Sequence, residues 1–275
     1  MIYGFTAENW KLKLLRHPVE DSYSIDSNNK ILAVADGVTR DPAEKLSTLK
    51  FILNYPNPSP AKIAAEIFIQ IFPLVLKDYN EANKDEKAIK TAFEEANKKL
   101  KEWNKQNMPN PDYVTRDFAG CVASGTLEKK GIVYWGYLTD CGIAIFDDKG
   151  NLKFRTENQG PDKHEKYIWQ DERLNRIGWE NPGARRIFRR DYRNNPSEPH
   201  SFGVLTGEET AMHYVKTGVQ EIKSNENLIV YTDGLESTIF SGEFSDILRK
   251  RDLNNLTKLC KKKVKTEGTL IYSNP

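Results

Sequence analysis

Two segments, ILAVADGV at 31–38 and LIVYTDGL at 228–235, follow the same pattern although most of the chain separates them. Each is a largely apolar run, rich in β-branched residues, that ends in Asp-Gly and resumes with an aliphatic residue. Such runs predict buried strands, whereas Asp-Gly alone usually marks only a turn. Because the same carboxylate-bearing strand end occurs twice, we expect two neighbouring strands whose ends meet and bring Asp36 and Asp233 to one site.

The rest of the pattern predicts strands in groups, then two helices, then strands again, one helix and a final strand. Strands are expected at 22–26, 31–36, 121–127, 132–138, 142–147, 213–222, 228–233 and 269–273. Helices are expected at 62–79, 86–105 and 246–264. Ser59 before Pro60 is typical of a helix start, and Pro73 should kink or divide the first helix. Tight connections at 128–131 and 147–150 indicate hairpins, so we expect an α+β fold with helices packed over antiparallel sheets.

Composition and charge exclude several classes of protein. The chain has 275 residues, which we treat as a single domain, 1–275, and its formal net charge of +2 argues against a general nucleic-acid-binding protein. The three cysteines, Cys121, Cys141 and Cys260, form neither a disulfide framework nor a zinc motif and suit a reducing compartment. No apolar run approaches the length of a membrane span, and the N-terminus lacks a signal peptide. We expect a cytoplasmic protein without nucleic-acid or membrane partners.

Further carboxylates stand at strand ends. The run YWGYLTD ends at Asp140, and Glu20 and Asp21 come directly before the strand at 22–26. Because neighbouring side chains of a strand point to opposite faces, one of Glu20 and Asp21 can contact a metal ion while the other supports it. Glu-Asp pairs are common on surfaces, but the joint pattern favours a site for Mg²⁺ or Mn²⁺, which take oxygen ligands. Two such ions could share one carboxylate and clamp an attacking water against a phosphoryl group.

The order of these motifs resembles that of the metal-dependent serine/threonine protein phosphatases, the PPM or type 2C family. The matching segments are R-x-x-x-E-D at 16–21, the strand into Asp36-Gly37, FAGCVASGTL, YLTDCG and LIVYTDGL, and together they extend over nearly the whole chain. The resemblance implies a four-layer α-β-β-α sandwich of two antiparallel sheets. It also implies hydrolysis of phosphoserine and phosphothreonine in phosphorylated proteins, with two Mn²⁺ or Mg²⁺ ions and a weaker third.

The resemblance also implies which residues bind these ions. Asp36 resembles the carboxylate that bridges both ions, and the Gly37 carbonyl and Glu20 complete one of the two sites. Asp233 resembles the ligand of the other site, and Asp140 resembles a ligand of the weaker third ion.

Other residues are implied to act beside the ions. Asp21 resembles the residue that orients water at the metal site, and Arg16 resembles the family's phosphate-binding arginine, because a guanidinium suits two phosphate oxygens. Residues 160–200 fall where the family has a mobile flap beside the active site. The arginines of this segment either read acidic groups around the phosphorylated residue or form a solvated surface; they are Arg185, Arg186, Arg189, Arg190 and Arg193.

The last metal-binding position departs from the family pattern. Just before the final strand, the family usually has an Asp-Asn or Asp-Asp pair whose Asp binds a metal ion. This chain has Thr266 and Glu267 there, so only Glu267 can bind an ion. Some members also have a histidine after the first Asp-Gly, where this chain has Val38, and His17 is the only nearby imidazole. Two functions therefore stay open: an active phosphatase, and an inactive or weak regulatory module that binds phosphoproteins.

Overall fold

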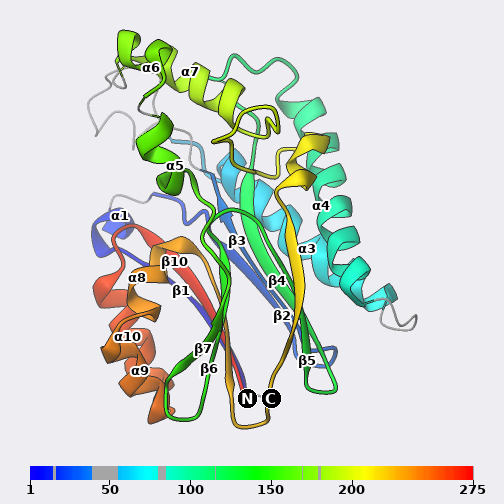
Figure 1. The fold of residues 1–275 in the computed structure, drawn as a ribbon, viewed down its shortest axis with the longest axis vertical. Helices are drawn as coiled ribbons and strands as arrows, with labels where there is room; N and C mark the ends of the chain where they lie inside the picture. Colours follow the sequence, from blue (N-terminus) through cyan, green and yellow to red (C-terminus); the bar gives the residue numbers. More distant parts are fainter. Residues whose placement is uncertain are drawn as a thin grey trace.

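The computed structural model describes residues 1–14, 17–38, 55–79, 85–114, 116–168, 170–178 and 181–274. Its strands form two five-stranded antiparallel sheets that lie face to face (Figure 1). Sheet 1 has the order β1-β10-β9-β6-β7, with bounds Ile2–Glu8, Glu267–Ser273, Asn227–Tyr231, Gly142–Phe146 and Leu152–Arg155. Sheet 2 has the order β2-β3-β4-β5-β8, with bounds Ser22–Asp26, Ile31–Gly37, Cys121–Lys129, Ile132–Tyr137 and Lys216–Glu221.

Helices cover the outer face of each sheet (Figure 1). Sheet 2 is covered by α3 (Pro60–Tyr79) and α4 (Asp85–Asn107), and sheet 1 by α8 (Glu236–Ile239), α9 (Gly242–Arg249) and α10 (Leu253–Lys263). The remaining helices are α1 (Trp10–Leu14), α5 (Pro161–Ile168), α6 (Glu172–Ile177), α7 (Pro182–Ile187), the π-helix η1 (Phe188–Tyr192) and the 3₁₀ helices η2 (Glu209–His213) and η3 (Asp233–Leu235). The α-β-β-α sandwich is thus confirmed. Among the described helices, none is long and apolar enough to cross a membrane.

The two predicted Asp-Gly strands, β3 and β9, are buried on both faces. On β3, Ile31 and Ala33 pack toward α3 and α4, whereas Leu32 and Val34 pack between the sheets. On β9, Val230 likewise packs between the sheets, while its neighbours face α8 to α10. Because side chains alternate along a strand, this pattern fixes which residues beyond the strand ends enter the space between the sheets.

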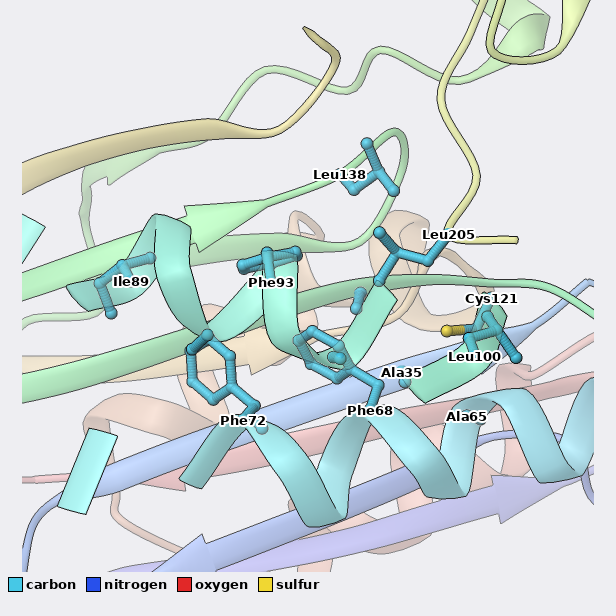
Figure 2. Close-up of a cluster of buried hydrophobic side chains, with 14 of the residues drawn as sticks. Ala35, Ala65, Phe68, Phe72, Ile89, Phe93, Leu100, Cys121, Leu138 and Leu205 are labelled. Carbon is cyan, nitrogen blue, oxygen red and sulfur yellow. The ribbon is translucent and has the colours of Figure 1, made fainter. Parts of the chain in front are cut away.

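Aromatic side chains fill the layer between sheet 2 and its helices, as Figure 2 shows. The rings of Phe68 and Phe72 on α3 stack at 5.1 Å, and Phe93 on α4 lies 4.9 and 5.6 Å from them. Gly125 on β4 makes room for this group, because a Cβ there would collide with the Phe72 ring. A larger residue at position 125 would therefore displace the Phe72 ring.

The start of α3 is the one predicted from the sequence. The Ser59 hydroxyl accepts a hydrogen bond from the backbone N–H of Lys62 at 3.0 Å, which caps the helix. Pro73 does not divide the helix, which continues to Tyr79. Pro73 is itself buried in the apolar face of α3, and this packing outweighs the backbone hydrogen bond that a proline removes.

Several features differ from the sequence-based expectation, and β7, α1 and α5 to α7 were not expected at all. The strands β3 and β9 are not neighbours in one sheet; they lie in opposite sheets and contact each other across the interface. The single helix expected at 246–264 is two helices, α9 and α10, separated near Arg251, whose φ is 54°. Finally, β1 was not expected, because the segment IYGFTAE carries only a weak alternation of polar and apolar residues.

Replacing Phe72 by alanine should lower the free energy of unfolding by about 3–5 kcal/mol, because it removes a fully buried ring from a packed aromatic group. Leu74→Ala is the matched control: Leu74 lies on the same helix but is 55% exposed, so its loss should change stability by about 0.5 kcal/mol or less. Urea unfolding followed by circular dichroism measures both. Equal effects of the two substitutions would contradict this account of the core.

Candidate metal centre

Three acidic side chains meet between the sheets at one end of the sandwich. One carboxylate oxygen from each of Asp21, Asp36 and Glu267 lies within 4.8 Å of the others. Asp21 directly precedes β2, Asp36 is the last residue but one of β3, and Glu267 begins β10. Asp36 has the same orientation along β3 as Leu32 and Val34, so the alternation that builds the inter-sheet core also turns this carboxylate inward.

The same alternation separates Glu20 from Asp21. Asp21 points between the sheets with Ile25, whereas the fully buried Glu20 points toward the start of α3. There its carboxylate accepts hydrogen bonds from Tyr55, at 2.6 Å, and from the Ser59 hydroxyl. The structure therefore groups Asp21, and not Glu20, with Asp36, although the resemblance implies the opposite roles for the adjacent pair.

Glu20 nevertheless supports the site through its backbone. Its N–H donates to both carboxylate oxygens of Glu267, each at 3.0 Å. This contact joins the segment before β2 in sheet 2 to the first residue of β10 in sheet 1. Glu267 is thus held in the cluster, whereas Thr266, the other residue at the altered family position, is exposed.

Burial and mutual repulsion raise the pKa of these carboxyl groups. Burial is the largest cause for Asp21, whose pKa rises to about 6, and for Glu267, whose pKa rises to about 8. The pKa of Asp36 is raised well above its usual value by burial and by the charges of Asp21, Asp233 and Asp140. A carboxylate that is both desolvated and next to like charges is stabilised most by a bound cation.

Asp233 lies beside this cluster, at the start of η3 and two residues after the last residue of β9. Its charge and a side-chain hydrogen bond both raise the pKa of Asp36, so the two Asp-Gly carboxylates do approach each other. The neighbouring Thr232 was not singled out in the sequence. Its hydroxyl donates to Asp21 at 2.8 Å and accepts from the backbone N–H of Thr269 at 2.8 Å, so it joins β9, β10 and the acidic cluster.

The glycines that follow the two aspartates serve a close approach of backbones. A Cβ on Gly37 would lie 2.6 Å from the carbonyl group of Ala61 on α3, and a Cβ on Gly234 would overlap the carbonyl oxygen of Glu267. Neither glycine has a positive φ. Asp-Gly therefore recurs because each acidic strand end packs directly against another backbone, not because the chain needs a left-handed turn there.

A second acidic group lies around Asp140. A Cβ on Gly160 would stand 2.7 Å from an Asp162 oxygen, 3.0 Å from an Asp140 oxygen and 3.1 Å from the side-chain oxygen of Asn158, so three side-chain oxygens lie close together. The Asn158 oxygen also accepts a hydrogen bond from the backbone N–H of Gly160 at 2.7 Å. The other Asp140 oxygen is buried and has no hydrogen-bond partner in the described part of the chain. Burial, and then the charge of Asp233, raise the pKa of Asp140 to about 8.

The donor sets of both groups fit Mg²⁺ or Mn²⁺, which prefer carboxylate and carbonyl oxygens. Asp21, Asp36 and Glu267 offer carboxylates that converge on one space. One Asp140 oxygen lies near the side-chain oxygens of Asp162 and Asn158, and its other oxygen is buried without a hydrogen-bond partner among the described residues. The predicted phosphate-binding Arg16 lies outside the described residues. The centre of the His17 ring lies 4.7 Å from that of Tyr55, with the ring planes tilted by 30°, and its Nδ1 is 2.9 Å from the carbonyl oxygen of Pro18.

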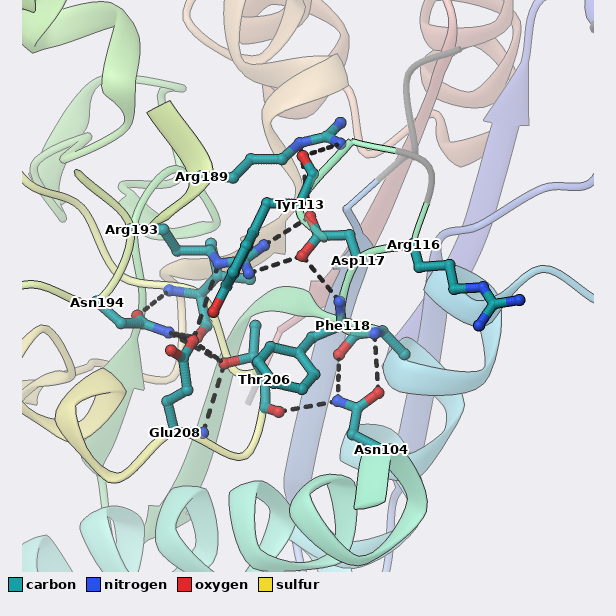
Figure 3. A network of polar contacts seen from close by, with 12 residues as sticks. Asn104, Tyr113, Arg116, Asp117, Phe118, Arg189, Arg193, Asn194, Thr206 and Glu208 are labelled. Carbon is teal, nitrogen blue, oxygen red and sulfur yellow. Dashed lines mark hydrogen bonds and ion pairs between the residues drawn. The ribbon is translucent and has the colours of Figure 1, made fainter. Parts of the chain in front are cut away.

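The arginine cluster shows a different use of charge, drawn in Figure 3. Arg193 is buried and donates to both carboxylate oxygens of Asp117 at 2.9 and 2.8 Å, and its guanidinium lies 5.8 Å from the ring centre of Tyr113. Arg189 also contacts Asp117, at 3.5 Å. Arg193 thus fits neither sequence-based interpretation, because it fastens the end of η1 to the segment before β4.

Comparison with known proteins identifies the fold. No protein-family model matches the sequence, and no curated protein matches it either. The serine/threonine phosphatase PstP/Ppp of Mycobacterium tuberculosis is 14% identical, with a TM-score of 0.62 over 99% of this chain and 97% of that chain.

Two further solved structures have the same architecture. The Streptococcus agalactiae (S. agalactiae) serine/threonine phosphatase is 13% identical, with a TM-score of 0.63 over 99% of this chain and 98% of its own. PppA, a key regulatory component of the T6SS in Pseudomonas aeruginosa, is 11% identical, with a TM-score of 0.61 over 99% of this chain and 96% of its own. This chain therefore has the fold of the serine/threonine phosphatases of the PPM type, as its motif order indicates.

Proposed function

We propose that this protein is a metal-dependent phosphatase that hydrolyses phosphoserine and phosphothreonine in proteins with the help of Mn²⁺ or Mg²⁺. The observation that carries the proposal is the convergence of Asp21, Asp36 and Glu267 within 4.8 Å at one end of the sandwich. The fold supports it, because the catalytic domain of PstP, similar in fold at 13% identity, was solved in complex with two manganese ions.

In this proposal Asp36 is the shared ligand, because the charges of Asp21, Asp233 and Asp140 all act on its carboxyl group. Asp21 and Glu267 would hold one cation together with Asp36, and Asp233 would hold the other, with the Gly37 carbonyl as a further donor. Glu20 acts indirectly, because its backbone N–H orients Glu267. Asp140, with Asn158 and Asp162, forms the weaker third site.

The chemistry follows from this arrangement. The two cations, when bound, supply positive charge that favours ionisation of water and offsets the charge of the phosphoryl oxygens. Thr232 holds Asp21 in place, and the hydrogen bond that it donates favours the ionised carboxylate. The packed strands β3, β9 and β10 keep the acidic groups at fixed separations, so the site does not need to reorganise during the reaction. Arg16 is the proposed phosphate-binding residue.

The second candidate function is a weak or inactive module that binds phosphoproteins. Two features favour it: Glu267 replaces the usual aspartate, and Val38 stands where some relatives have a histidine. Hydrolysis of an aryl phosphate and of a phosphothreonine peptide in Mn²⁺, in Mg²⁺ and in chelator separates the two. We expect hydrolysis that requires a metal ion and is faster with Mn²⁺, which tolerates irregular ligand geometry better than Mg²⁺. Binding of the peptide without hydrolysis in either metal would favour the module.

Replacing the shared ligand tests the arrangement. Asp36→Asn should lower kcat/KM for an aryl phosphate at least about 100-fold, because it removes a negative charge that both cations share. Without metal the same variant should be as stable as the original protein or more stable, since a repulsive charge is gone. The exposed Asp148→Asn is the control and should change neither quantity. Turnover of Asp36→Asn at the rate of the original protein would rule out a shared ligand at this position.

The raised pKa values also predict how stability depends on pH. Without metal, Asp21 and Glu267 bind protons more tightly in the folded state, with pKa values of about 6 and 8 against 3.8 and 4.5. Their protonation favours folding at low pH, and this contribution is lost as the pH rises from about 4 to 8. Thermal unfolding of the metal-free protein should show this loss.

Two comparisons assign the loss to these groups. Glu267→Gln should reduce the fall in Tm across this range, whereas the exposed Glu221→Gln on β8 should leave it unchanged. Added Mn²⁺ should stabilise the original protein most at the high end, because a cation competes with protons for the carboxylates. The same pH profile for Glu267→Gln and the original protein would contradict the placement of Glu267 in the cluster.

A further inference from the structure

A cavity of about 480 Å³ lies beside the second acidic group. Its walls are the 157–159 segment, the first part of α5 with Lys163 and His164, and the 201–203 segment with Tyr214. A volume of this size falls in the range that binds small molecules or a few residues of a peptide. Apart from Asn158, none of the proposed metal ligands lines the cavity, and the proposed reaction does not account for it.

The cavity shares a wall with the metal centre. Thr139 lines the cavity, and the next residue is Asp140. Asn158 also lines it, and its side-chain oxygen lies beside Gly160 near an Asp140 oxygen. The charge of Asp140 also raises the pKa of Asp36, so the cavity lies on the side of the sandwich that holds the acidic residues.

The walls are fastened to one another without a ligand. The backbone N–H of Gln159 donates to the Thr139 carbonyl oxygen at 2.7 Å, and the Ser201 and Tyr214 hydroxyls are 2.5 Å apart. The His200 ring stacks on Tyr167 of α5 at 4.4 Å, with an angle of 5° between the ring planes. The cavity is therefore formed before a ligand arrives, so little ordering is needed on binding.

The lining has the chemistry of a peptide site. The hydroxyls of Thr139, Ser201 and Tyr214 and the carboxamide of Asn158 already make hydrogen bonds within the protein. The Gln159 carboxamide both donates and accepts hydrogen bonds, as the main chain of an extended peptide requires. Charge distinguishes its two sides. Lys163 on α5 is exposed and forms no ion pair with any described residue, whereas the carboxylate of Glu157 lies on the side of Tyr137.

We propose that this cavity binds the peptide chain next to the phosphorylated residue and that Lys163 selects substrates with an acidic residue there; this inference rests on the proposed phosphatase function. Lys163 attracts a carboxylate to the α5 side, and the Gln159 carboxamide binds the peptide backbone. An aryl phosphate has no flanking chain, so the cavity does not contribute to its hydrolysis.

The test compares three substrates in Mn²⁺: an aryl phosphate, a phosphothreonine peptide flanked by glutamates, and the same peptide flanked by lysines. Lys163→Glu should lower kcat/KM for the glutamate peptide about tenfold, which corresponds to about 1.4 kcal/mol, and raise it for the lysine peptide. Hydrolysis of the aryl phosphate should stay the same. Lys166→Glu is the matched control: it makes the same charge change on the exposed face of α5 outside the cavity and should leave all three rates unchanged.

The outcomes separate this inference from the proposed function. If the aryl phosphate is hydrolysed but Lys163→Glu does not change the preference between the peptides, the inference is wrong and the phosphatase function stands. If no substrate is hydrolysed, the phosphatase function is wrong, and fluorescence anisotropy with the same labelled peptides decides the inference. Tighter binding of the glutamate peptide that is lost in Lys163→Glu would support it, and equal binding by the two proteins would overturn it.

Discussion

Asp21, Asp36 and Glu267 repel one another in a space that is largely withdrawn from water. Two like charges about 4 Å apart cost about 4 kcal/mol at the effective dielectric of a protein surface. The strands that carry these groups must therefore be held by contacts that do not depend on them. The apolar layers supply those contacts, because β3, β9 and β10 are packed both between the sheets and against the helices. Apolar packing thus maintains an acidic cluster that would separate if the strand ends were free.

Close backbone approach is the second requirement of this arrangement. Gly37 brings the end of β3 against the first turn of α3, and Gly234 brings the end of β9 against the start of β10. The hydrogen bonds of Glu20 and Thr232 then join the two sheets at the same end. Any side chain larger than hydrogen at either glycine would push one acidic residue away from the others. The repeated Asp-Gly pattern is therefore explained by sterics: each aspartate can reach the site only if the next residue has no side chain.

Local pattern predicted most of the elements and most of the acidic residues, because alternation and helical spacing act over a few residues. Alternation also predicts which of Glu20 and Asp21 points between the sheets. Asp21 is two and four residues before Tyr23 and Ile25, the apolar residues of β2, so its side chain lies on the same face as theirs. The sheet assignment of β3 and β9 depended on pairing between distant segments, which local pattern does not show. The same holds for Arg193, whose partner Asp117 is 76 residues away in the chain.

Because the cavity lies next to Asp140, the proposed reaction should bind its metal ions and its substrate in a fixed order. A phosphorylated peptide brings negative charge to the same end of the sandwich as the buried carboxylates, so its binding is unfavourable until cations neutralise them. For the proposed function we therefore expect metal binding to precede substrate binding. Lys163 lies on α5, outside the cluster of Asp21, Asp36 and Glu267, and it forms no ion pair with another described residue. It can attract an acidic peptide without competing for the metal ligands, which separates the choice of substrate from the chemistry of the phosphoryl group.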